Sequence, residues 1–163
     1  MAVQTGRTVS KWVSFNLGDS GNGTLRTIPI DTLSACGVTY DETDLTAWMD
    51  AVKGVLPNMP SAPIDISGPF DTTAAATVGS LSGSHTILSA INGALTPLTV
   101  DVRIGMRHAW ETGEPNFGIT ATATAGYLCT SYNVDFGSQK YSAHFDLFPG
   151  STLPAFGTSD ETT

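Results

Sequence analysis

Charged side chains are scarce in this sequence: they make up 13% of its 163 residues, about half of what a soluble domain usually carries. Lys and Arg number only 7 against 15 Asp and Glu, which gives a net charge of −8. A surface that grips DNA neutralises phosphates with clustered Lys and Arg, so this balance excludes one. An acidic surface can still meet DNA by repelling it and letting it pass. The low charge also fits a surface largely covered by partners, although Thr-rich β-proteins share it.

Cysteine is rare as well. Cys36 and Cys129 are too far apart in the sequence for a C-x-x-C metal or redox pair, and we expect two reduced structural thiols rather than a disulfide. No apolar run approaches the roughly 18 residues of a membrane span, and the N-terminus lacks the apolar core of a signal peptide. We therefore expect no membrane partner and a protein made in the cytoplasm. The length predicts a single domain, 1–163, with a flexible N-terminal segment (1–9) and a C-terminal tail (150–163).

Alternation of apolar and polar residues predicts most of the secondary structure. It marks strands over 11–19, 25–31, 62–71, 97–104 and 119–126, followed by a hairpin over 126–150. Pro29 cannot donate to a strand ladder, so the second strand should lie at an edge or end there. The sequence predicts a mainly β fold, a β-sandwich or split barrel of about seven to eight strands, with a helix on its flank.

The helix is predicted over about 43–55. Asp41 or Thr43 can cap its N-terminus, and Pro57 forbids continuation. Its apolar residues recur at helical spacing and would pack on the sheet: Leu45, Trp48, Met49, Val52 and Val55. A shorter apolar spacing over 87–91 indicates one further helical turn.

The segment "VGSLSGSH", residues 78–85, raises the question of catalysis. A nucleophile elbow needs G-x-S-x-G between a strand and a helix, and here Leu81 stands where the serine should be. A hydrolase using Ser82 and His85 is therefore a minor alternative, as is a carbohydrate-binding sandwich. His85, His108 and His144 have no metal-ligand spacing, and no phosphate-binding glycine motif occurs. We predict no catalytic, cofactor-binding or metal-binding residue, and a protein that is not an enzyme.

The order of segments resembles the tail tube (major tail) proteins of long-tailed bacteriophages with flexible tails. The resemblance is carried by "GDSGNGTLRTIPID", by "YDETDLTAWMDAVKGVLPNMPSAPIDISGPFD", by "LSGSHTILSAINGALTPLTVDVRIGMRHAWETGEPNFGITATATAGYLCTSYNVD" and by a closing "LPAFGT". It implies a structural virion protein whose six copies form a ring, with rings stacking into a tube and DNA passing through an acidic lumen. The implied partners are further copies of the chain, the tape-measure protein, and the tail-terminator and distal tail proteins. The alternative is another virion protein, such as a head decoration or a head-to-tail connector or terminator.

On this resemblance we expect two groups of site residues. Polar positions of the central strands would face the lumen, with solvent-facing outer positions as the alternative: Asp65, Asp101, Asp135 and Asp146. Residues near ends and loops would contact neighbouring subunits: Trp12, Trp110, Phe156, Thr72, Ser82 and Ser84. The small residues of 72–84 would make this segment a contact loop, mobile in the free subunit and fixed on assembly.

Overall fold

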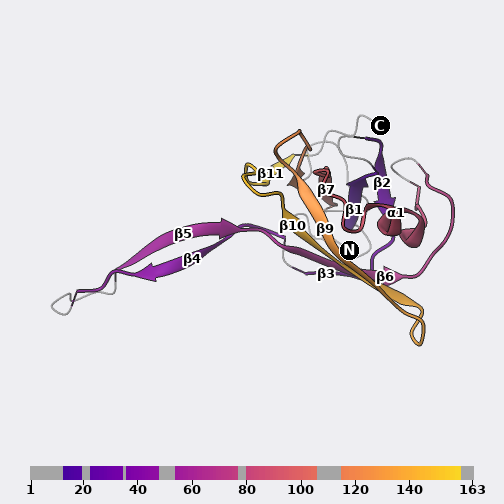
Figure 1. The fold of residues 1–163 in the computed structure, drawn as a ribbon, viewed down its shortest axis with the longest axis horizontal. Helices are drawn as coiled ribbons and strands as arrows, with labels where there is room; N and C mark the ends of the chain where they lie inside the picture. The colour runs from indigo at the N-terminus through magenta and orange to yellow at the C-terminus, as the bar shows by residue number, and fades with distance from the viewer. Residues whose placement is uncertain are drawn as a thin grey trace, which may run out of the picture.

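The part of the chain that the structure describes is built from strands, with one short helix (Figure 1). The computed structural model describes residues 13–19, 23–34, 36–47, 54–76, 80–105 and 115–158. Within these ranges lie eleven strands: β1 (Val13–Gly18), β2 (Leu25–Ile28), β3 (Thr32–Ser34), β4 (Thr39–Asp44), β5 (Val55–Ser61), β6 (Ile64–Pro69), β7 (Val100–Ile104), β8 (Pro115–Ile119), β9 (Tyr127–Asp135), β10 (Lys140–Leu147) and β11 (Ala155–Thr158). The helix is α1 (Ser84–Ile91). The prediction of a mainly β fold is confirmed, with more strands than the expected seven to eight.

Two antiparallel sheets share one core. One sheet has five strands in the order β11-β8-β7-β1-β2, and the other has four in the order β3-β6-β10-β9. Their inner faces supply a common apolar cluster, in which Phe15 of β1 meets Phe145 of β10 with ring centroids 5.5 Å apart. A bridge between Leu98 and Tyr127 joins the two sheets at one end. The remaining pair, β4 and β5, forms a separate two-stranded hairpin.

Alternation located several of the core strands, among them β1, β6 and β7. Phe15 and Leu17 of β1 are fully buried, and so is Ile64 of β6, whose neighbour Asp65 is exposed. This period of two is what a sheet with one wet face requires. β2 lies at the edge of its sheet and ends just before Pro29, as predicted. The hairpin predicted over 126–150 is present as β9 and β10.

The predicted helix over 43–55 is wrong at its described residues. Residues 43–44 belong to β4, residues 45–47 and 54 are not helical, and Val55 begins β5. The Leu45 amide donates to the Gly54 carbonyl at 2.9 Å, which continues the hairpin ladder. Leu45 is 57% exposed, so no apolar surface packs against it to stabilise an amphipathic helix here. Trp48, Met49 and Val52 lie outside the described residues.

The helix of this fold is instead the turn predicted over 87–91. Its apolar side chains Ile87, Leu88 and Ile91 are buried in the common core, against β9 and β10. It ends at Asn92, and Gly93 follows with φ +74°, in the left-handed region where glycine is favoured. The helix search over the described residues finds none long and apolar enough to span a membrane.

Two further strand predictions differ from the structure. Residues 120–126 form no strand, because alternating Thr and Ala bury too little apolar area to fix a register. β8 lies earlier, at Pro115–Ile119 and so mostly before the predicted strand, and β11 lies in the expected C-terminal tail, where it pairs with β8. Residues 1–9 are outside the described part of the chain.

Both cysteines are free thiols, as predicted. Cys129 is buried and Cys36 is half-buried in the same core. Burial raises the pKa of each thiol to about 11, so both stay protonated and act as small apolar side chains.

The segment before α1 is tied to the body at its described residues. The Ser82 hydroxyl accepts from the Ala76 amide at 2.9 Å and donates to the Ala76 carbonyl at 3.1 Å. The Ser84 hydroxyl likewise accepts from the Asp71 amide and donates to the Pro69 carbonyl. Both serines are 0% exposed, so in this form their hydroxyls cannot reach a neighbouring subunit. Their role is to hold the segment 71–76 in place.

Replacing Ser82 with Ala should destabilise the isolated chain by about 1–3 kcal/mol, because the Ala76 amide loses its acceptor and the Ala76 carbonyl keeps only the Arg26 guanidinium as a donor. Urea unfolding of the free subunit measures this loss. Ser80, which is exposed, provides the matched control, and Ser80→Ala should change stability by less than about 0.5 kcal/mol. Equal stabilities for the two variants would contradict the role given to Ser82.

Candidate functional site

The outer surface of the four-stranded sheet is polar. Strand pairing places Asp65 opposite His144, Ser67 opposite Ser142 and Lys140 opposite Asp135, all on the side away from the core. We call this surface the polar face; it comprises Thr32, Ser34, Asp65, Ser67, Thr130, Ser131, Asn133, Asp135, Lys140, Ser142, His144 and Asp146. It carries hydroxyls and carboxylates but no aromatic side chain. Three of the four predicted lumen residues thus share one surface.

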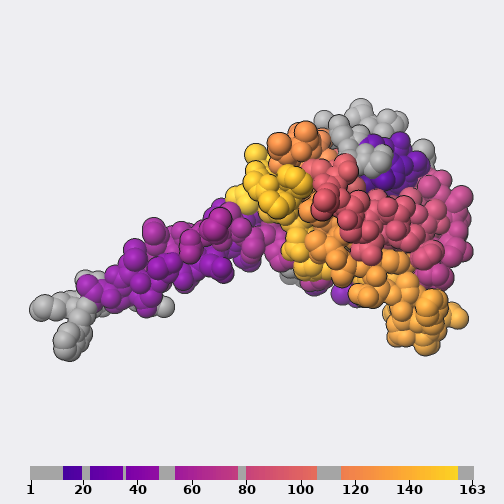
Figure 2. Space-filling view, viewed as in Figure 1, coloured from indigo at the N-terminus to yellow at the C-terminus, as the bar shows by residue number. Residues whose placement is uncertain are grey.

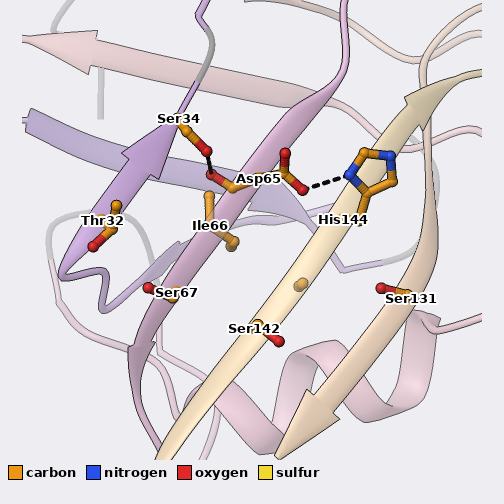
Figure 3. A pocket seen from close by; sticks show the side chains of 9 residues that line it. Thr32, Ser34, Asp65, Ile66, Ser67, Ser131, Ser142 and His144 are labelled. Atoms are coloured by element: carbon orange, nitrogen blue, oxygen red, sulfur yellow. Dashed lines mark hydrogen bonds and ion pairs between the residues drawn. The ribbon is translucent and has the colours of Figure 1, made fainter.

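A groove crosses the polar face between β3, β6 and β10 (Figure 3). The side chains of Thr32, Ser34 and Ser67 stand along one side, with Ser142 and His144 on the other. Its floor is formed by Ile66 and Ala143. The groove is an open trough in a sheet surface, with no deep enclosed end in which a small substrate could be held.

His144 lies between two carboxylates on the polar face. Its Nδ1 is 2.5 Å from Asp65 Oδ1 on the neighbouring strand, and its Nε2 is 3.3 Å from Asp146 Oδ1 on its own strand. The Thr130 hydroxyl donates to the other oxygen of Asp146 at 3.1 Å. The hydrogen bond with Asp65, and then the charges of Asp146 and Asp65, raise the pKa of His144 against the opposing effect of partial burial. We call His144, Asp65 and Asp146 the His144 cluster.

The other acidic groups on or beside this face have local partners. Asp135 accepts from the Gly137 amide at 2.9 Å and from the Ser138 hydroxyl at 2.7 Å, and closes the β9–β10 turn. These hydrogen bonds, that of Ser138 first, lower the pKa of Asp135. At the same end of the sheet, Lys140 forms an ion pair with Asp31 at 2.9 Å. The net charge of the polar face is therefore negative.

Asp101, the fourth predicted lumen residue, lies elsewhere. It is on β7 of the five-stranded sheet, half-buried, with Asp101 Oδ2 2.6 Å from the Arg103 guanidinium. Its other oxygen accepts from the Asn116 amide group at 2.9 Å. The sequence could not separate Asp101 from the others, because alternation gives the face of a strand and not the sheet to which that strand belongs.

The β4–β5 hairpin projects from the body as a thin arm (Figure 2). Every residue of both strands is exposed, although several are apolar: Met59 is 78% exposed and Leu56 is 55% exposed. Pro57 and Pro60 remove two backbone donors from β5, so this strand cannot offer a complete ladder to another strand. We call the described part of the hairpin, 39–47 and 54–61, the arm. An exposed apolar extension of this kind indicates a contact that the single chain does not make.

The predicted contact residues have different environments. Phe156 is 62% exposed on the edge strand β11, and its ring centroid lies 4.8 Å from that of Phe117 with the two rings tilted by 49°. Thr72 is also exposed. Trp12 and Trp110 lie outside the described residues. Ser82 and Ser84 are buried and bonded within the chain.

The hydrolase alternative finds no support at Ser82 and His85. The Ser82 hydroxyl is bonded to the Ala76 backbone, while His85 Nδ1 lies 3.0 Å from the Tyr132 hydroxyl. In the part of the chain that the structure describes, no group of three or more His, Cys, Asp or Glu side chains is placed to hold a metal ion.

Two features of these surfaces escaped sequence reasoning. The spacing of apolar residues predicts a helix where the arm lies. The signal against that helix is the pair Pro57 and Pro60: a single proline is enough to end a helix, and the second indicates an extended segment. His144 was noted only as a histidine without metal spacing. Its position on the polar side of an alternating strand could have been read from the sequence, but its carboxylate partner on β6 could not.

Comparisons with known proteins give a fold but no family. No protein-family model and no curated protein sequence matches the chain. Chains from three structures determined by cryo-electron microscopy are among those with a similar fold. A chain of the sheath–tube complex of the extracellular contractile injection system PVC, in its extended state, matches with TM-score 0.55 and 10% identity, covering 94% of this chain and 93% of that one.

The other two are terminating parts of such particles. A chain of the PVC sheath/tube terminator matches with TM-score 0.55 and 12% identity, over 96% of this chain and 99% of that one. A chain of the anti-feeding prophage cap, described as a tube-terminating cap, matches with TM-score 0.57 and 13% identity, over 98% and 95%. At such low identities the likeness shows the fold alone. The chain therefore has, over nearly its whole length, the fold of chains from contractile sheath–tube, terminator and cap structures.

Proposed function

We propose that the chain is a structural, non-enzymatic subunit that assembles with copies of itself into the tube, or the tube end, of a phage-tail-like particle. The observation that carries this proposal is the likeness of fold, which extends over 93–99% of each similar chain as well as 94–98% of this one. All three similar chains come from sheath–tube, terminator or cap assemblies.

The arm supports assembly independently of the likeness. A single chain that leaves Met59 and Leu56 in water loses about 1.5–3 kcal/mol for each such side chain compared with burying it. Packing the arm against a neighbouring copy recovers that energy. Because Pro57 and Pro60 interrupt the donors of β5, we propose that the arm docks mainly through its side chains. The same prolines limit uncontrolled strand pairing between free subunits.

The polar face supports a channel. We propose that this face lines the lumen of a ring, with Asp65, Asp135 and Asp146 directed inward, and that Asp101 stabilises the five-stranded sheet instead. A negative lumen would let DNA pass without phosphate contacts that would slow it. Six copies per ring, a flexible tail, and the tape-measure and distal tail proteins as partners are proposed on the sequence resemblance. Phe156 and Thr72, which are exposed, are proposed as contacts between subunits.

A second candidate is a terminator that closes the tube. Two of the similar structures are terminators or caps, and a terminator was among the alternatives that the sequence suggested. The two candidates differ in stacking, because a tube subunit must bind copies above and below its ring, whereas a terminator stacks on one side only. Both place the protein in the particle after synthesis in the bacterial host cytoplasm.

Negative-stain electron microscopy of the purified chain, with light scattering across a concentration series, tests the proposal. A tube subunit should form rings that stack into tubes of variable length. A terminator should form single rings that do not lengthen as the concentration rises. A chain that remains monomeric at every concentration would contradict both candidates.

Substitution of the arm tests its part in assembly. Met59→Asp should leave the fold and its unfolding midpoint unchanged, since Met59 is 78% exposed, and should reduce the assembled fraction at least tenfold. The reason is that an assembled neighbour would bury an unpaired charge. Sedimentation of assembled material against soluble subunits measures the effect.

Leu95→Asp is the matched control for the arm. Leu95 is 81% exposed and lies in the connection between α1 and β7, so this substitution adds the same charge away from the arm. It should leave assembly unchanged. If Met59→Asp also assembles like the unmodified chain, the arm is not a contact between subunits.

A further inference from the structure

We propose that the His144 cluster is a pH-sensitive charge site that sets the net charge of the polar face and thereby the strength of ring assembly. This inference rests on the proposed function, because it takes the polar face as a surface that several copies turn toward a common channel. It concerns regulation of that surface.

The geometry of the cluster favours a protonated ring. A neutral imidazole has one N–H and can donate one hydrogen bond, whereas an imidazolium donates two. Both ring nitrogens of His144 face carboxylate oxygens, which only accept: Asp65 Oδ1 at 2.5 Å and Asp146 Oδ1 at 3.3 Å. Only the protonated ring can donate to both of them, and the raised pKa of His144 agrees with this.

Among the described residues, none that faces His144 carries a positive charge. From β9 the groups facing His144 are the hydroxyls of Ser131 and Thr130, and from β6 the group is Asp65. The strand beyond β6 contributes Ser34 to the groove. Farther along β10, Lys140 is already paired with Asp31. Asp65 and Asp146 thus determine the response of His144.

Deprotonation changes the charge that each subunit presents. With the imidazolium between two carboxylates the cluster carries a charge of −1, and with the neutral ring it carries −2. The folded-state pKa is raised above the ordinary value of 6.5, so the stabilisation is fully present below pH 6.5 and is lost as the pH rises through the raised pKa. In a ring the extra negative charge appears on every copy around one channel, and assembly weakens over the same pH interval.

The first experiment measures the site without requiring assembly. The imidazole resonances of His144 are titrated by NMR in the non-assembling Met59→Asp chain, with and without Asp65→Asn. We expect a midpoint above 6.5 that falls when Asp65 is neutralised. A midpoint at or below 6.5, or one that does not move with Asp65→Asn, would overturn the inference and leave the proposed function untouched.

The second experiment links the site to assembly. The sedimented fraction of the unmodified chain is measured from pH 5.5 to 9, at low salt and at about 1 M salt, where screening shortens the range of charge to about 3 Å. We expect assembly to be lost toward high pH at low salt and much less so at high salt. His144→Gln, whose cluster stays at −2, should show the weaker assembly throughout and no such transition.

His85→Gln is the matched control. His85 is the other described histidine and lies on α1, bonded to Tyr132. Its replacement should preserve the pH transition. A His144→Gln chain that keeps the transition of the unmodified chain would overturn the inference. Absence of particles at every pH would overturn the proposed function, and with it the link to assembly, while the NMR titration would still decide the charge site.

Discussion

The rings of Phe15 and Phe145, one from each sheet, meet inside the core. The burial of apolar side chains between the two sheets is the constraint on which the rest of the structure depends. Two antiparallel sheets bury their inner faces against each other, and α1 adds Ile87, Leu88 and Ile91 to the same cluster. Each such side chain stabilises the fold by about 1.5–3 kcal/mol on burial. Even the two thiols and the Tyr127 hydroxyl, which donates to the Ala62 carbonyl at 2.9 Å, are absorbed into this interior.

The polar face follows from that core. In β6 and β10 every second residue must point inward, so the residues between them must point out. Asp65 on β6 and His144 on the adjacent strand β10 lie opposite each other, because the same strand register pairs the buried residues Ile66 and Ala143. A shift of one residue would exchange the two sets. The charge properties of the outer surface are thus fixed by the packing of the inner one.

The arm, in contrast, contributes no side chain to the core. β4 and β5 pair only with each other, and their apolar residues remain in water. Here the helical spacing from Leu45 to Val55 predicted the wrong element, because amphipathic spacing stabilises a helix only where a surface receives its apolar face. β8 and β11 were missed because strands of five and four residues carry little pattern of their own, and β11 in addition lies at the edge of its sheet.

The sequence by itself determined the β class, the core strands β1, β6 and β7, the edge position of β2, the hairpin of β9 and β10, and the reduced thiols. Each of these depends on a local period or a local residue preference. Only the tertiary structure decided that Asp65 and Asp146 flank His144 while Asp101 lies on the other sheet, that Ser82 and Ser84 are internal, and that residues 39–47 and 54–61 form an extended arm. These outcomes depend on which strands become neighbours, and long-range pairing is set by the shared core rather than by any short stretch of sequence.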